Sequence, residues 1–200
     1  MFAIDLHPPI FLAIYAFIFL IILLTHKKKS TKYTLLSDSI CALYILLLIK
    51  VAIFPIIILR PESRIAFQEN ISTEYVQLYN IVPFNLIGTL IRTADTGAWK
   101  LQLLGNILML APIPVLLSLR TKKSISVHIL LGIGALVSLS IELVQYSINL
   151  ITQFPSRDPN IDDFILNIIG VAFAVIVIKH IESRPLFSRI KSLSIKGYHY

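Results

Sequence analysis

The sequence predicts an all-α membrane protein, a polytopic bundle of about five transmembrane helices. Of its 200 residues, 56% are hydrophobic and only 14% are charged, and the mean hydropathy is +0.80. A soluble domain carries about 25% charged residues, so this chain lacks almost half of the charge that a water-exposed surface needs. The shortage excludes a disordered chain, which combines low hydrophobicity with high charge, and it argues against a water-soluble enzyme.

Five apolar stretches are long enough to cross a bilayer. The expected transmembrane segments are Pro9–Leu24, Leu35–Leu59, Leu101–Leu119, Val127–Ile148 and Ile161–Ile178. The first is short, as in a signal peptide, but no basic segment precedes it, and lysines follow it instead of a small-residue cleavage site. We therefore interpret it as a retained helix.

The connection between the second and third segments, residues 60–100, is the longest. Its centre, residues 79–87, is apolar but too short to span the bilayer, and Pro83 interrupts it. Two interpretations of residues 80–91 stay open. They form either an interfacial or re-entrant segment covered by protein, where irregular backbone is tolerated, or a solvated surface loop.

The basic residues predict the orientation in the plasma membrane. Twelve of the 18 Lys and Arg lie in loops 25–34 and 120–126 and in the tail after residue 178, whereas five lie on the other side. The positive-inside rule places the N-terminus outside and the C-terminus in the cytoplasm. The net charge of +7 then reflects topology, so we expect membrane lipids and no nucleic acid as partners.

Two pairs of polar residues lie near the outer ends of the fourth and fifth segments. Glu142 and Gln145 share a helix face, as do Asp163 and Asn167, because residues three or four apart are neighbours on a helix. A charge at the bilayer centre costs about 2.5–3.5 kcal/mol on insertion scales. Such residues therefore predict a functional site.

Three further polar groups approach the same level, and they are Lys50, Asn106 and Arg157. Charged groups inside a membrane usually face the bundle interior and pair with one another, so we expect Lys50 to pair with Glu142 or Asp163. The sequence predicts an outward-facing polar pocket that contains Lys50, Asn106, Glu142, Gln145, Arg157, Asp163 and Asn167.

Structural roles compete with this interpretation. Asp162 is expected mainly to cap the N-terminus of the fifth helix, where a carboxylate accepts backbone N–H bonds. Asn106 and Asn167 could hydrogen-bond between closely packed helices. Lys50 could extend its head group to the interface, and Arg157 could be a solvated loop residue.

No metal site or cofactor is predicted. The five histidines are scattered, and Cys41, the one cysteine, lies in an apolar run. The sequence contains no nucleophile elbow, P-loop or dinucleotide fingerprint.

The polar residues follow one another in an order that is similar to a known family. The run Glu142-x-x-Gln145, then Arg157, then Asp162-Asp163-x-x-x-Asn167-x-x-Gly170 resembles the VanZ-like family. Upstream, Asn80-x-x-Pro83-Phe84 and Gly105-Asn106 resemble two further family segments. The resemblance covers residues 35–181. It implies a membrane domain there. An extra N-terminal helix with a basic cytoplasmic loop, residues 1–34, and a basic cytoplasmic tail, residues 182–200, lie outside the matched region.

The resemblance implies a protein of the Gram-positive cell envelope that lowers susceptibility to teicoplanin, a lipoglycopeptide antibiotic. In the first hypothesis the pocket binds a lipid-linked wall precursor, a lipid head group or the antibiotic. In the second, the protein is an enzyme that modifies an envelope lipid, with Glu142 or Asp163 as general base and Lys50 or Arg157 stabilising negative charge. A transporter fits less well, because five helices without a repeat lack the two-halved architecture of many carriers.

Overall fold

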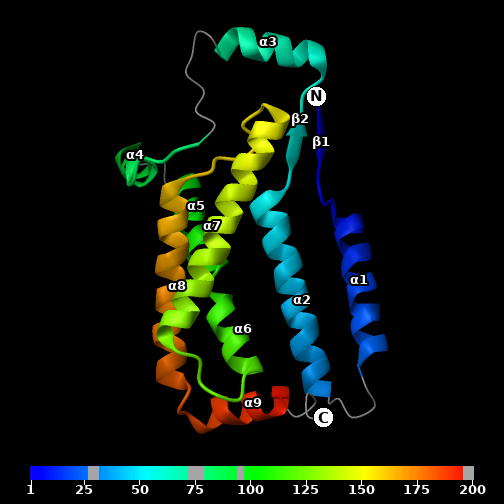
Figure 1. Ribbon diagram of the computed structural model, residues 1–200, viewed down its shortest axis with the longest axis vertical. Helices are drawn as coiled ribbons and strands as arrows, with labels where there is room; N and C mark the ends of the chain where they lie inside the picture. The colour runs from blue at the N-terminus through cyan, green and yellow to red at the C-terminus, as the bar shows by residue number, and fades with distance from the viewer. Residues whose placement is uncertain (27–31, 72–78, 94–96, 196–200) are drawn as a thin grey trace.

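The computed structural model describes residues 1–26, 32–71, 79–93 and 97–195. Within these ranges the protein is a helical bundle with a two-stranded sheet at one end (Figure 1). Five spans are long and apolar enough to cross a membrane: Pro8–Thr25, Lys32–Ile53, Leu101–Arg120, Val127–Thr152 and Ile161–Ile181. The prediction of an all-α polytopic membrane protein is thereby confirmed. The lysines at 27–29 and the last five residues of the tail lie outside the described residues.

The elements follow one another as β1 (Phe2–Ile4), α1 (Pro8–Thr25), α2 (Lys32–Ile53), β2 (Ile56–Ile58), α3 (Pro61–Ile71), α4 (Asn85–Thr93), α5 (Ala98–Met109), α6 (Pro112–Arg120), α7 (Val127–Thr152), α8 (Ile161–Ile181) and α9 (Pro185–Ile195).

The second span ends earlier than the sequence predicts, at Ile53 instead of Leu59. Pro55 has no backbone N–H and cannot continue a helix. The residues that follow it form β2, which pairs antiparallel with β1 so that Ile57 lies opposite Ala3. The correction moves Lys50 into the last turn of α2, where a cation is favoured by the helix dipole.

The third span is divided into two helices, α5 and α6, by Pro112. The Ile113 N–H donates to the carbonyl of Leu110 at 3.1 Å, which leaves the carbonyl of Met109 without its helical donor. The Tyr44 hydroxyl of α2 donates to that Met109 oxygen at 2.9 Å. A side chain from a neighbouring helix thus satisfies a group that lipid could not.

Helix α8 is the most buried of the five spans and packs against α5, α6 and α7. Two glycines allow this close approach. At Gly170 of α8, an added Cβ would overlap the backbone carbonyl of Ile107 in α5. At Gly134 of α7, it would lie 2.7 Å from the side chain of Val171. Small residues at helix contacts are typical of membrane bundles.

The two ends of the bundle differ. Figure 1 shows α9 lying across one end, whereas β1, β2, α3 and α4 lie at the other. At that second end the segment before α4 exposes the apolar side chains of Ile81, Val82 and Phe84. An interfacial position for residues 80–91 stays a prediction.

Gly170→Ala is expected to destabilise the bundle strongly, because the methyl group would meet the rigid backbone of α5 and overpacking costs about 1–3 kcal/mol. The measurement is the midpoint of thermal unfolding of the purified protein in detergent. Gly132→Ala is the control, since an added Cβ there has nothing within 4 Å. Equal midpoints for the two variants would contradict the close contact of α5 and α8.

Candidate functional site

A cavity of about 450 Å³ lies at the end of the bundle away from α9. It is enclosed by α2, α5, α7, the α7–α8 connection and the start of α8. Five residues of the pocket predicted from the sequence line it: Asn106, Glu142, Gln145, Arg157 and Asp163. We call this space the polar cavity.

Helix α7 presents three polar side chains on one face, and each has a backbone partner. The Glu142 Oε2 atom accepts the N–H of Asn160 at 2.8 Å. The Gln145 amide donates to the carbonyl of Ala52 at 2.7 Å. The Asn149 side chain is fully buried, and its amide donates to the carbonyl of Arg157 at 2.8 Å. This face of α7 therefore supports the irregular backbone around the polar cavity.

Arg157 has both a structural contact and a free donor. Its Nε–H donates to the carbonyl of Ile53 at 3.2 Å, one of the C-terminal carbonyls that a helix cannot satisfy internally. Its Nη2 atom is buried without a partner among the described residues. Burial lowers the pKa of Arg157 from its usual value, opposed by the negative charge of Asp5. Arg157 is buried at this atom and lines the polar cavity, so it is more than a solvated loop residue.

The N-cap of α8 is Asn160. The prediction of Asp162 as this cap is therefore wrong. The Asn160 side-chain oxygen accepts the N–H of Asp162 at 3.0 Å. The fully buried Asp162 carboxylate instead caps α4, where it accepts the N–H of Phe84 at 2.5 Å and that of Ile87 at 3.1 Å. Phe84 has φ 63°, a left-handed conformation that bulky residues rarely adopt. Asp162 therefore holds a strained turn against α8.

Two acidic groups complete the polar cavity. The Oδ1 atom of Asp163 is buried and has no hydrogen-bond partner among the described residues. Burial raises the pKa of Asp158, and the nearby polar side chain of Asn160 opposes that rise. Asp163 thus carries an acceptor that the fold does not use.

The structure does not bring Lys50 to the polar cavity. Its ammonium lies over the ring of Phe11 in α1, 5.3 Å from the centroid, an arrangement that attracts a cation to the face of an aromatic ring. The predicted ion pair of Lys50 with Glu142 or Asp163 is wrong, since no such contact occurs within the described part of the chain. Lys50 lies nearer the helix end than the sequence predicts, and α1 offers it a partner.

Asn167 also lies away from the lining. It is fully buried, and its side-chain amide donates to the hydroxyl of Ser138 in α7 at 3.0 Å. This contact matches its alternative role between closely packed helices.

Three polar residues of this region are not among those predicted from the sequence. Gln102 and Asp158 line the polar cavity, and Asn149 supports its edge. Gln102 precedes Asn106 by one helical turn, and Asn149 follows Gln145 by one turn, so helical spacing could have revealed both. Asp158 lies in a loop and gives no such signal.

A second cavity of about 350 Å³ lies on the other side of Glu142. Apart from Glu142 and two asparagines, its lining is apolar or aromatic, and it consists of Tyr79, Ile81, Leu139, Leu143, Tyr146, Pro159, Ile161 and Phe164. The rings of Tyr79 and Tyr146 meet edge to face, 5.5 Å apart. We call this space the apolar groove. Glu142 borders both cavities.

The family resemblance seen in the order of these residues was compared with models of protein families. A model of the VanZ/LLP1 family matches residues 41–182, more than half of the chain. The protein belongs to the VanZ/LLP1 family. No curated protein and no solved structure matches the chain.

We call residues 41–182 the family region of this VanZ/LLP1 protein. Every residue that lines the polar cavity or the apolar groove lies within it. Helices α1 and α9 lie outside it. Among the described residues, no group of three or more His, Cys, Asp or Glu is arranged to hold a metal ion.

The adjacent aspartates provide a matched test of the site. Asp162→Asn is expected to lower the unfolding free energy by about 1–3 kcal/mol, because the new NH₂ group would face a backbone donor in a buried position. Asp163→Asn is expected to leave stability unchanged or higher, since its Oδ1 accepts no bond. Thermal unfolding measures both effects, and proteolysis of the connection before α5 would report release of α4. Equal loss in the two variants would contradict the assignment of Asp162 as the cap of α4.

Proposed function

We propose that this VanZ/LLP1 protein binds an amphiphile of the bacterial cell envelope and thereby lowers susceptibility to teicoplanin-type lipoglycopeptides in a Gram-positive bacterium. The amphiphile is a lipid-linked wall precursor, a lipid head group or the antibiotic itself. The observation that carries the proposal is the position of Glu142 between the polar cavity and the apolar groove.

The paired cavities match the two parts of an amphiphile. The polar cavity, of about 450 Å³, offers side-chain donors and acceptors, and the apolar groove, of about 350 Å³, is lined mainly by hydrocarbon and aromatic surface. Both volumes lie in the range of about 300–1,000 Å³ that small-molecule sites occupy. A ligand with its head group in the first and its chain in the second would pass Glu142 at the junction.

The charges of the polar cavity favour a head group rich in hydrogen-bond donors. Three carboxyl groups, Glu142, Asp158 and Asp163, face a single guanidinium, that of Arg157. Carboxylates accept hydrogen bonds from hydroxyl and ammonium groups, while Arg157 can bind one anionic group. This balance suits a sugar or amino-acid head group better than a bare pyrophosphate.

The proposal includes the predicted orientation, with the polar cavity at the outer leaflet. In a protein with Cys41→Ala, Glu62→Cys on α3 is expected to react with a membrane-impermeant thiol reagent in intact cells, because the positive-inside rule puts that end outside. Lys123→Cys, which is also exposed, is expected to react only after the cells are opened. The reverse pattern would place the cavities at the cytoplasmic side and overturn this proposal.

An enzyme that modifies an envelope lipid is the second candidate. The observation in its favour is that Asp163 and Arg157, each with a buried polar atom that has no hydrogen-bond partner among the described residues, line one cavity together with Glu142. In that mechanism Glu142 or Asp163 is the general base, and Arg157 stabilises developing negative charge.

Glu142→Gln tests the two candidates together. The glutamine oxygen can still accept the Asn160 N–H, so the variant keeps its fold but loses the charge. We expect binding of the amphiphile to weaken about 10- to 100-fold, the range for a lost hydrogen bond to a charged group, and teicoplanin susceptibility to rise. The measurements are susceptibility and a comparison of envelope lipids and wall precursors in cells with and without the protein.

Glu62→Gln, on the exposed start of α3, is the control and should behave as the unmodified protein. A lipid species that depends on Glu142 would favour the enzyme, whereas unchanged composition with altered susceptibility would favour binding. Unchanged susceptibility in Glu142→Gln at equal protein levels would refute both.

A further inference from the structure

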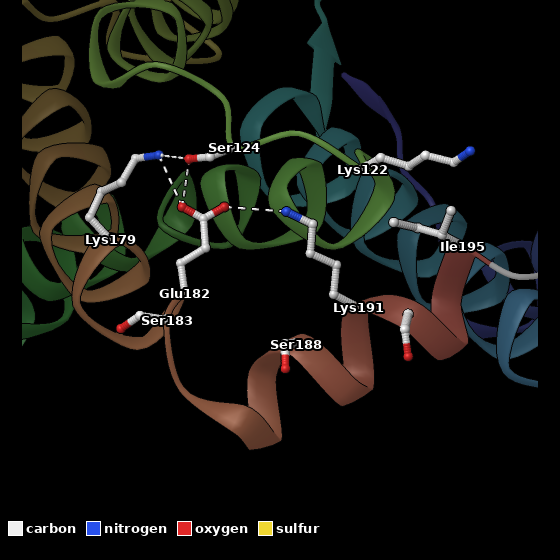
Figure 2. Close-up of a pocket in the computed structure, with 9 residues that line it drawn as sticks. Lys122, Ser124, Lys179, Glu182, Ser183, Ser188, Lys191 and Ile195 are labelled. Atoms are coloured by element: carbon white, nitrogen blue, oxygen red, sulfur yellow. Dashed lines mark hydrogen bonds and ion pairs between the residues drawn. The ribbon is translucent and has the colours of Figure 1, made fainter.

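A third cavity, of about 880 Å³, lies at the opposite end of the molecule. It is formed by the loop between α6 and α7, the C-terminal end of α8 and one face of α9 (Figure 2). Basic and hydroxyl side chains dominate its lining, among them Lys122, Ser124, Lys179, Ser188, Lys191 and Ser192. We call this space the basic cavity.

Glu182 organises the basic cavity. Its Oε2 atom accepts the Ser124 hydroxyl at 2.7 Å and the Lys179 ammonium at 3.1 Å, and its Oε1 atom accepts the Lys191 ammonium at 3.3 Å. Burial alone would raise the pKa of Glu182, but these hydrogen bonds lower it below its usual value. Figure 2 shows the carboxylate between the two ammonium groups. One ionised group thus ties the loop, α8 and α9 together.

The two lysines beside Glu182 have different roles. Lys179 also donates to the Ser124 hydroxyl at 2.6 Å and to the Ile125 carbonyl at 2.5 Å, so all three of its N–H donors are used. Lys191 makes a single hydrogen bond among the described residues, the one to Glu182. An ammonium has three donors, and two of those of Lys191 are therefore available to a ligand. Its side chain is only 12% exposed, which strengthens its electrostatic interactions.

Helix α9 contributes Lys191 and two serines to the lining of the same space. Ser188, Lys191 and Ser192 lie three and four residues apart and line the basic cavity. The hydroxyls of Ser188 and Ser192 donate to the carbonyls of Pro185 and Arg189, each at 2.8 Å, so Lys191 is the residue of this face with donors to spare. Phe187 and Ser194, on the neighbouring face, are buried, and α9 packs against α2 and α6. Lys179 lies in the last turn of the membrane-spanning α8. The basic cavity is therefore at the depth where a bilayer has its phosphate groups.

We propose that the basic cavity binds a phosphoryl anion, carried either by the head group of an anionic phospholipid or by a soluble phosphate ester. The lining contains three lysines and one glutamate, so it attracts an anion, and lysine is a common donor to phosphate oxygens. Basic pockets at membrane ends attract anionic head groups for the same reason. The volume accommodates a phosphate together with a glycerol or a similar substituent. This proposal concerns a separate site and does not rest on the proposed function.

The test uses the full-length protein in a neutral detergent. Calorimetric titrations compare short-chain phosphatidylglycerol, short-chain phosphatidylcholine and glycerol 3-phosphate. We expect saturable binding of phosphatidylglycerol that Lys122→Gln with Lys191→Gln weakens at least about tenfold, given roughly fivefold for each lysine near such a surface. Glutamine at position 191 can still donate to Glu182, so the variant keeps the contact of α9.

The control variant, Arg184→Gln with Arg189→Gln, removes two positive charges beside the cavity but not from its lining. It should change the affinity less than about twofold. Binding of glycerol 3-phosphate as tightly as phosphatidylglycerol supports the soluble ester, and binding of phosphatidylglycerol alone supports the lipid. Equal loss in the two double variants, equal binding of phosphatidylcholine or no saturable binding would each overturn the proposal.

Discussion

The buried Asp162 carboxylate, through its bonds to the N–H groups of Phe84 and Ile87, is the interaction on which both cavities near α4 depend. It holds the segment before α4 against α8, where the backbone of Asn80 pairs with that of Asn160. Asn160 in turn donates its N–H to Glu142. Irregular backbone at the end of a membrane bundle requires such partners, because lipid supplies none. Most polar side chains of this region therefore bond to the backbone and stabilise the fold. Only the polar atoms without a partner in the protein are available to a ligand.

The sequence predicts the membrane spans and most of the polar cavity because both follow from local spacing. Hydropathy identifies each span, and the three-residue spacing of Glu142 and Gln145 puts them on one face of α7 whatever the neighbours are. The partner of a charged group depends instead on which helices meet. The contacts of Lys50 with Phe11 and of Asp162 with α4 join distant parts of the chain, so spacing alone could not reveal them. The pairing of β1 with β2 is hidden for the same reason.

The two ends of the bundle carry opposite kinds of site. The polar cavity gathers carboxyl groups around Arg157, whereas the basic cavity gathers lysines around Glu182. Arg157 is the cation among the carboxyl groups of the first, and Glu182 is the anion among the lysines of the second. Each is hydrogen-bonded to the protein and orders the segments around it. The charge asymmetry that predicts the orientation of the chain in a membrane thus also gives the two cavities opposite electrostatic character.

Helix α1 illustrates how an appended element can alter a site that it does not line. It lies outside residues 41–182, it is the least buried of the five spans, and it packs on α2. Yet its Phe11 ring lies against the ammonium of Lys50, a cation of α2 that could otherwise join Arg157 as a counter-ion for the acidic lining. By keeping that cation elsewhere, α1 preserves the excess of acceptors in the polar cavity. Helix α1 therefore influences the charge balance beside the polar cavity from outside the family region.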